Sequence, residues 1–235
     1  NENLLNYLES DPQYLGSKRN KDAMIIFGAN VKYPNNHIHN TAQIIPPNQH
    51  ADSYFKKHLV PFGEAVPFPL SFINKWLPKL NQFDAKFTSG VFEYDNLSIS
   101  MGICYDIFFS DFLLRKPAHV ILHILDDHWA KRSLLRELQF RQTKLLALSL
   151  QVPVISASSD GLSGIVDQSG QIKVMEKANI GFISKRLSLS APPEQNSIKI
   201  AIYMRDFLVI VTLLIYPLFV IRNKWGIRVR KLQPY

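Results

Sequence analysis

A single cysteine, Cys104, stands in the segment MGICYD over residues 101–106 and is the only cysteine of the 235 residues. It therefore cannot form an intrachain disulfide. A second segment upstream, KKHLVPFGE over residues 56–64, offers lysine and carboxylate groups. A thiol that can meet a lysine and a carboxylate is a candidate nucleophile. The alternative is a small buried apolar residue, because free cysteine is among the most buried residue types.

The apolar, β-prone run before Cys104 predicts a strand over 97–104, so the thiol stands where a strand ends. A helix is predicted over 133–150, where leucines recur with helical spacing. Strands are further predicted over 23–31, 39–46, 91–94, 119–125, 152–157 and 161–166, and a helix over 2–8. Strands outnumber helices, and a helix falls between successive strands in the middle of the chain. This order favours a layered α/β domain with a mixed sheet.

The net charge of +8 is mostly a property of the C-terminus. Five basic residues and no acidic residue lie in the last fourteen positions, so the rest of the chain carries only +3. We therefore expect no nucleic-acid partner. The histidines show no regular metal spacing; His119 and His123 lie two pleats apart in a predicted strand. We expect neither a metal nor a cofactor.

The most apolar stretch, residues 207–221, contains fifteen residues without a charge and directly precedes the basic cluster. A bilayer span needs about 20 residues, which an extension back to residue 198 supplies. Basic residues after an apolar run are typical of a cytoplasmic flank. We therefore predict a transmembrane helix over 198–222, a basic cytoplasmic tail over 223–235 and an extracytoplasmic domain over 1–197. The alternative is a buried C-terminal helix of a soluble domain. Since no signal peptide is visible, we also expect membrane segments or an export signal upstream.

Four motifs together resemble one family. They are a lysine followed by HLVPFGE, then G-x-C-Y-[DE], an apolar strand that ends in D-x-W, and P-V-x-x-A-S-x-D-G. This set resembles the nitrilase, or carbon–nitrogen hydrolase, superfamily, and the K-x-HLVPFGE form is typical of the apolipoprotein N-acyltransferases. The resemblance implies a four-layer α-β-β-α sandwich on the periplasmic side of a bacterial inner membrane.

The chemistry that the resemblance implies is acyl transfer through a cysteine thioester. A phospholipid is the acyl donor, and the N-terminal diacylglyceryl-cysteine of an apolipoprotein is the acceptor. By motif position, Cys104 corresponds to the nucleophile, Lys56 to the lysine that stabilises thiolate and oxyanion, and Glu64 to the glutamate that holds this lysine. The backbone N–H of Tyr105 corresponds to the second oxyanion donor, and Asp106 to a supporting carboxylate.

Trp129, in the D-x-W motif, could line the substrate cleft or simply pack. Three departures from the family pattern leave activity open. We identify no triad glutamate upstream of Lys56. Asp106 replaces a glutamate, and Leu146 and Ser149 replace the charges of an R-A-x-E pattern. We therefore expect this polypeptide to be inactive alone. The alternatives are a membrane-tethered amidase or nitrilase, and a degenerate nitrilase-fold module that binds lipid or a partner.

Overall fold

The computed structural model describes residues 23–33, 37–47, 50–67, 83–109, 116–128, 134–177 and 183–192, and single positions at 70, 72, 76 and between 199 and 215. The chain divides into two compact units, Asn1–Pro193 and Glu194–Tyr235. The site residues discussed below all belong to the first unit.

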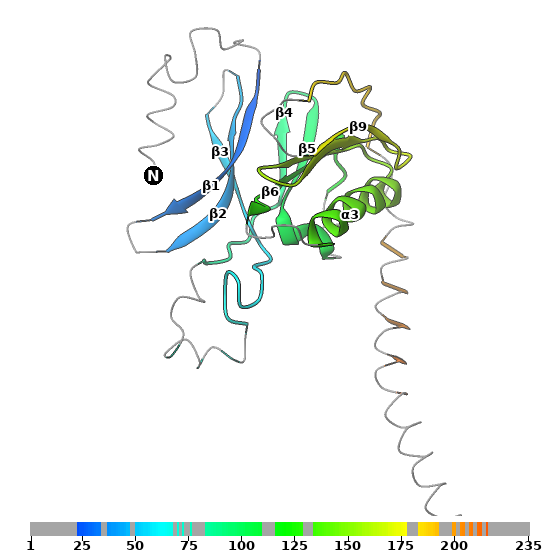
Figure 1. Cartoon of the computed structure of the whole chain (residues 1–235). Coiled ribbons are helices and arrows are strands. Elements are labelled where there is room, and N and C mark those ends of the chain that lie inside the picture. Colours follow the sequence, from blue (N-terminus) through cyan, green and yellow to red (C-terminus); the bar gives the residue numbers. More distant parts are fainter. Residues whose placement is uncertain are drawn as a thin grey trace, which may run out of the picture. The chain divides into compact units, whose positions relative to one another are not determined.

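The first unit contains two β-sheets (Figure 1). The smaller sheet is antiparallel, with the order β1 (Ile25–Lys32), β2 (Ile38–Ile45) and β3 (Asp52–Phe55). The larger sheet keeps its six strands in sequence order: β4 (Val91–Tyr94), β5 (Leu97–Ile103), β6 (Val120–Leu125), β7 (Val154–Ser158), β8 (Leu162–Val166) and β9 (Ile172–Lys177). Of the neighbouring strand pairs in this sheet, β5–β6 and β6–β7 are parallel and the others are antiparallel.

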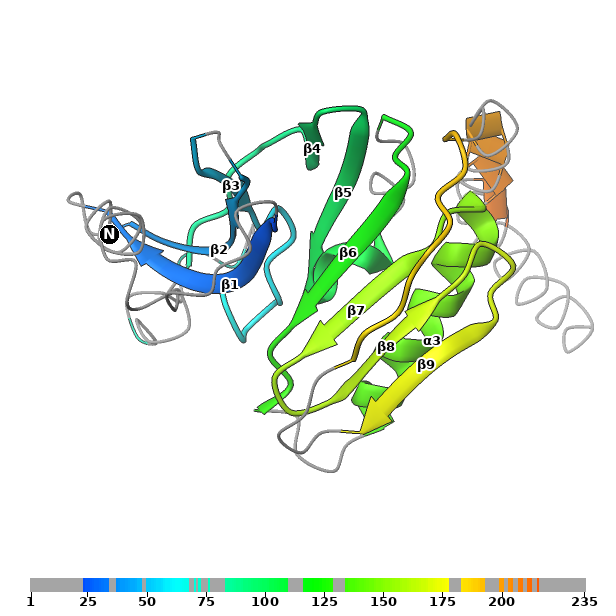
Figure 2. The ribbon, with the colours of Figure 1, turned by 90° about the horizontal axis from the view of Figure 1, so that it is seen from above.

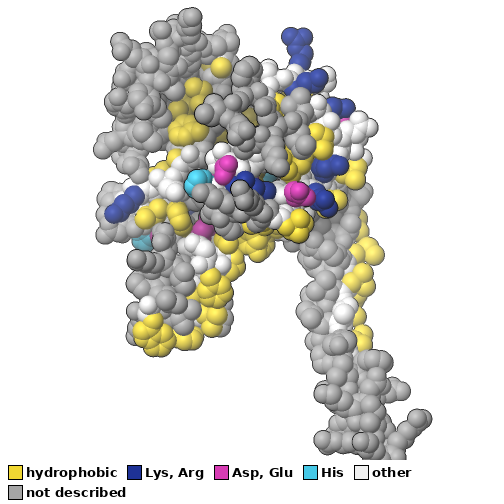
Figure 3. Space-filling view, in the orientation of Figure 1, with side chains coloured by type: hydrophobic (Ala, Val, Ile, Leu, Met, Phe, Trp, Pro, Cys, Tyr) yellow, Lys and Arg dark blue, Asp and Glu magenta, His cyan; other side chains and the backbone are white. Residues whose placement is uncertain are grey.

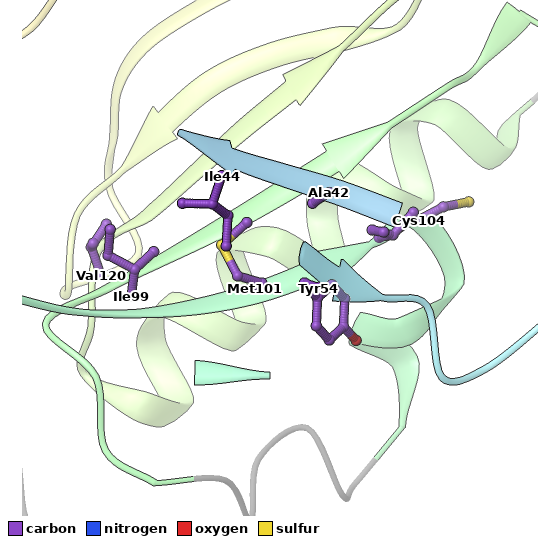
Figure 4. Close-up of a cluster of buried hydrophobic side chains, with 8 residues drawn as sticks. Ala42, Ile44, Tyr54, Ile99, Met101, Cys104 and Val120 are labelled. Carbon is purple, nitrogen blue, oxygen red and sulfur yellow. The ribbon is translucent and has the colours of Figure 1, made fainter. Parts of the chain in front are cut away.

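The two sheets face each other across an apolar core (Figure 4). Alternate residues of a strand point to opposite faces, so one set of β5 side chains fills this core. Buried members of the cluster are Ala42, Ile44, Tyr54, Ile99, Met101, Ile103, Cys104 and Val120. Gly28 of β1 leaves room for this approach, because a Cβ there would lie only 3.2 Å from Cγ2 of Ile124. The cluster thus brings the lysine-bearing end of β3 close to the cysteine-bearing end of β5.

Helix α3 (Leu134–Leu150) covers the opposite face of the larger sheet, as Figure 2 shows beside β7 and β8. Its buried residues recur at helical spacing: Gln139, Phe140, Thr143, Leu146, Ala147 and Leu150. The other set of strand side chains meets this face, and it includes the buried His123 of β6. The described residues thus supply three layers, formed by two sheets and one helix.

The strands and the helix predicted around Cys104 are confirmed, and β3 and β9 lie outside the predicted ranges. The helix predicted over 2–8 lies outside the described residues. In the C-terminal unit the described positions from 199 to 215 are helical, and their apolar side chains are exposed, as the space-filling view also shows (Figure 3). Within the described part of the chain, no helix is long and apolar enough to span a bilayer. The span over 198–222 and the tail over 223–235 remain predictions.

Candidate active site

Cys104 begins the short 3-10 helix η3 (Cys104–Phe108) directly after β5. Its φ is +48°, which is uncommon for a residue other than glycine and marks a sharp turn of the backbone. The side chain is only 7% exposed, and its sulfur points away from Ala42 and Tyr54 (Figure 4). The strand therefore ends in a tight elbow that carries the thiol.

The parallel strands bring further polar residues to the same edge of the sheet. Because β5, β6 and β7 run in one direction, the residues after each strand lie side by side. Asp127 follows β6, and Ser158 ends β7 and donates a hydrogen bond of 2.8 Å from Oγ to Oδ2 of Asp127. Arg136 of α3 donates to the backbone carbonyl of Asp127 at 2.8 Å. Asp127 is thereby fixed beside the elbow.

Lys56 follows β3 and is 1% exposed. Its ammonium donates to both carboxylate oxygens of Glu64, at 2.8 Å to Oε1 and 2.7 Å to Oε2. The same carboxylate accepts hydrogen bonds from Nδ2 of Asn40 at 3.2 Å and from the backbone N–H of Val60 at 2.8 Å. A buried ion pair needs such additional hydrogen bonds to offset desolvation.

The loop between these two residues explains how Glu64 reaches Lys56. The backbone N–H groups of Gly63 and Glu64 donate to the carbonyl of Val60 at 3.1 and 2.9 Å. Phe62 adopts a positive φ of 60° inside this turn. The turn folds the chain back on itself, so that a carboxylate eight positions after the lysine meets its ammonium.

Asp106 connects the lysine loop with the cysteine elbow. Its side chain is completely buried and accepts three hydrogen bonds. Oδ2 accepts from the hydroxyl of Tyr54 at 2.8 Å and from the N–H of Ile103 at 3.2 Å, and Oδ1 accepts from the N–H of His58 at 2.8 Å. The carboxylate thus binds to β3, to the loop after Lys56 and to the end of β5.

Two further buried residues contact Cys104 from the helix side of the sheet. Nε2 of Gln139 lies 3.2 Å from Sγ, and Nε2 of His123 lies 3.1 Å from the backbone carbonyl oxygen of Cys104. Both residues are at most 3% exposed. The cysteine is therefore held through its thiol and through its backbone.

Burial raises the pKa of the Cys104 thiol above its ordinary value of 9.0. The Lys56 ammonium and the Gln139 hydrogen bond act in the opposite direction, while the carboxylates of Glu64 and Asp127 raise the pKa further. Burial also raises the pKa of Asp127, against the Ser158 hydrogen bond and Arg136. The pKa of His123 falls to about 4 because its ring is buried. The resting site thus holds a neutral thiol and a neutral imidazole at pH 7.

Glu64 pairs with Lys56, Asp106 binds the loop after Lys56 and the end of β5, and the Lys56 ammonium acts on the Cys104 thiol. The catalytic roles of these residues remain predictions. Tyr105 follows Cys104 in η3, and its ring packs edge-on against Phe109 at 5.0 Å between centroids. Trp129 lies outside the described residues. Across the described ranges, no group of three or more His, Cys, Asp or Glu side chains could hold a metal ion.

Sequence reasoning missed Gln139, His123 and Asp127. A usable signal existed for Gln139, because it is a polar residue on the buried stripe of an amphipathic helix. For His123 the signal was a single polar ring in an otherwise apolar strand segment, HVILHIL over 119–125.

Proteins of known name and structure share this sequence pattern and fold. The apolipoprotein N-acyltransferase of Brucella melitensis is 33% identical over 124 residues, which cover 50% of this chain and 23% of that protein. The apolipoprotein N-acyltransferase of Allorhizobium ampelinum is 28% identical over 149 residues, 60% of this chain and 28% of that protein. These matches span well under a third of either relative.

One similar solved structure is Saccharomyces cerevisiae Nit3, a member of branch 10 of the nitrilase superfamily. It has a TM-score of 0.55 at 19% identity, and the match covers 70% of this chain and 60% of the Nit3 chain. The carbon-nitrogen hydrolase of Helicobacter pylori G27 has a TM-score of 0.53 at 14% identity, with 74% and 66% coverage. Both likenesses concern the fold. The family model of the carbon-nitrogen hydrolases matches residues 13–182. That range is most of the chain and contains the elbow, the lysine loop and α3, so this protein belongs to the carbon-nitrogen hydrolase family.

Proposed function

We propose that this chain is the catalytic domain of a lipoprotein N-acyltransferase. The observation that carries the proposal is the thiol of Cys104 on a sharp elbow, within electrostatic reach of the buried Lys56–Glu64 pair. Nucleophilic catalysis by cysteine needs such a thiol and a positive charge near the developing oxyanion. The name shared by the curated relatives supports an apolipoprotein N-terminus as the acceptor. Phospholipid as the acyl donor rests on the resemblance of the sequence motifs.

In the first step, the Cys104 thiolate attacks the ester carbonyl of a phospholipid. A C–S bond forms, and the ester C–O bond then breaks. The leaving oxygen takes up the proton that the thiol gave up, so the lysophospholipid departs as an alcohol. Lys56 stabilises the thiolate and the tetrahedral oxyanion, and the N–H of Tyr105 supplies the second oxyanion donor. Glu64 holds Lys56 in place.

In the second step, the α-amino group of the acceptor attacks the thioester. A C–N bond forms, the C–S bond breaks, and an amine proton returns to sulfur. Burial raises the pKa of Cys104, so only a small part of the thiol is ionised at neutral pH. Because we identify no triad glutamate in these 235 residues, we expect this polypeptide alone to form little thioester.

The same proposal assigns residues 1–197 to the periplasmic side of the inner membrane, 198–222 to one membrane helix and 223–235 to the cytoplasm. The uncharged run at 207–221 and the basic residues after it support this topology. Protease treatment of spheroplasts should then remove the domain and leave a protected C-terminal fragment. Complete protection of the domain would contradict the assignment.

An acyl adduct on Cys104 tests the chemistry. The 235-residue chain and the intact gene product are each incubated with phosphatidylethanolamine vesicles, quenched in acid and analysed by intact mass. We expect one acyl chain on Cys104 in the intact gene product and none in Cys104→Ala. The adduct should disappear when a diacylglyceryl-cysteine peptide is added, with the acyl chain recovered on the peptide.

Two other outcomes would overturn the proposal. Release of free fatty acid without transfer to the peptide would indicate a hydrolase of the amidase type, with water as acceptor. Absence of any adduct in the intact gene product, with several acyl donors, would indicate a binding module of the same fold.

A further inference from the structure

A closed ring of contacts surrounds Cys104 on the helix side of the sheet. The ring runs from the Cys104 carbonyl to Nε2 of His123 at 3.1 Å, and from Nδ1 of His123 to Oγ1 of Thr143 at 3.4 Å. Thr143 lies one helical turn after Gln139, whose Nε2 reaches Sγ of Cys104 at 3.2 Å. Three buried side chains thus connect the backbone of the nucleophile to its own sulfur.

The direction of the hydrogen bond to the Cys104 carbonyl is fixed by chemistry. A backbone carbonyl can only accept, so Nε2 of His123 carries a proton and donates it to Cys104. This assignment agrees with the neutral ring that burial enforces. The Thr143 hydroxyl donates to the carbonyl of Gln139 at 3.1 Å and lies 3.4 Å from Nδ1 of His123. His123 therefore lies between the elbow and α3, in contact with both.

One polar atom of the Gln139 side chain, Oε1, is buried without a hydrogen-bond partner in the structure as described. An unpartnered buried carbonyl costs free energy and is uncommon in native proteins. A side chain chosen for packing alone would not need this amide. The observation indicates that the N–H of Gln139 is kept for its contact with sulfur.

We propose that Gln139 is a catalytic hydrogen-bond donor to the Cys104 thiolate, and that His123 and Thr143 are positioning residues that hold the elbow and α3 in register. The inference rests on the proposed role of Cys104 as nucleophile, but it concerns the thiol and not the acyl donor. The charged groups that act on this thiol are Lys56, Glu64 and Asp127. Gln139 adds a neutral hydrogen-bond donor to the thiolate. Its amide does not ionise, so this donor is present at every pH at which the protein is folded.

The pH dependence of thiol alkylation tests the donor. Cys104 is the only cysteine of the chain, so uptake of iodoacetamide, followed by intact mass, reports on this thiol alone. The midpoint of the rate against pH gives the thiol pKa, whereas the plateau rate reports accessibility. In Gln139→Leu we expect the midpoint to rise by about one pH unit, because a hydrogen bond to a charged group is lost.

A matched control and a second variant keep this test decisive. Gln142 lies on the same helix, but its Nε2 donates to the carbonyl of Ile107 at 3.4 Å, so Gln142→Leu should leave the midpoint unchanged. Gln139→Glu keeps the size of the side chain but presents only acceptors, so its midpoint should rise at least as far as in Gln139→Leu. An unchanged midpoint in both Gln139 variants, with the fold retained by circular dichroism, would show that Gln139 only packs.

The positioning roles of His123 and Thr143 are tested by asking whether their substitution shifts the alkylation midpoint only when Gln139 is present. His123→Leu should raise the midpoint, and His123→Gln, which can still donate to the carbonyl, should restore it; Thr143→Val and Thr143→Ser form a second such pair. In a Gln139→Leu background, His123→Leu should add no further shift, because the contact it supports is already gone. An equal, additive shift in that background would overturn the positioning role. If acyl adducts are absent but these shifts occur, only the proposed function fails.

Discussion

The lysine side and the thiol side of the site are both buried, but they differ in how completely their polar atoms are satisfied. On the lysine side, each carboxylate oxygen of Glu64 accepts from Lys56 and from one further donor. On the thiol side, Oδ1 of Asp127, Oε1 of Gln139 and Oγ of Ser156 are buried without a partner among the residues that the structure describes.

The lysine side therefore has its hydrogen bonds complete in the resting protein, whereas, among the described residues, the thiol side does not. A buried ion pair with all its hydrogen bonds is rigid and needs no substrate to complete it. Unsatisfied polar atoms beside a nucleophile are expected where protons or ligands must be exchanged. We infer that the lysine side is fixed before substrate arrives, and that the thiol side changes its hydrogen bonding during the reaction.

The largest expected effect comes from breaking the lysine side. Lys56→Met leaves the partly buried Glu64 carboxylate without its cation, and we expect a loss of about 3 kcal/mol in the free energy of unfolding. Urea unfolding measures this loss. The matched control is Lys116→Met, since the ion pair of Lys116 with Glu93 is exposed and should contribute less than about 1 kcal/mol. Similar losses in the two variants would contradict a sealed lysine side.

The second effect tests the connection between the two sides. Asp106→Asn replaces an oxygen that accepts with an amide that donates, and so confronts the hydroxyl of Tyr54 or the N–H of His58 with another donor. We expect a loss of about 2 kcal/mol in stability. The alkylation midpoint of Cys104 should also rise, because Lys56 is no longer held against the elbow. A stability loss with an unchanged midpoint would show that Asp106 does not couple the two sides.

The third effect concerns pH and the thiol side. The pKa of His123 falls from 6.5 in the unfolded chain to about 4 in the folded protein, so the unfolded chain binds the extra proton first. Stability is therefore lost as pH falls from 6.5 towards 4, and the His123 contribution should amount to about 2 kcal/mol between pH 7 and pH 5. In His123→Gln this part of the loss should vanish. Urea unfolding of both proteins at both pH values measures it, and equal losses would rule out a buried neutral ring.

The smallest effect concerns the hydrogen bonds of the Asp127 carboxylate. Ser158→Ala removes a donor to Oδ2 of Asp127 and an acceptor for the N–H of Gly161, both at 2.8 Å. We expect a loss of about 1 kcal/mol in unfolding experiments. Ser159→Ala is the control, because its hydroxyl binds Asp126 at an exposed position. A neutral Ser158→Ala would mean that Asp127 is held by Arg136 alone.

Much of the sheet could be predicted from the sequence because its strands are apolar runs bounded by turns. Such runs predicted β5 and β6, and leucines at helical spacing predicted α3. β3 could not be predicted, because four residues that begin with an exposed aspartate carry no pattern until they pair with β2.

The site divides in the same way. Cys104, Lys56 and Glu64 were found because their motif has a fixed spacing along the chain. Gln139 and His123 were not, because their contacts depend on which faces of α3 and β6 meet the elbow. That choice is made by the packing of the helix on the sheet, and local sequence does not encode it.

The bidentate pairing of Lys56 has a consequence for the fate of an acyl chain. A thioester on Cys104 would carry its acyl carbon into the neighbourhood of a primary amine belonging to the protein itself. An ammonium whose protons are shared with both oxygens of Glu64 has no lone pair to attack with. In the proposed mechanism, the salt bridge would thus also protect the protein from acylating its own lysine and would leave the thioester intact for an amine that comes from outside.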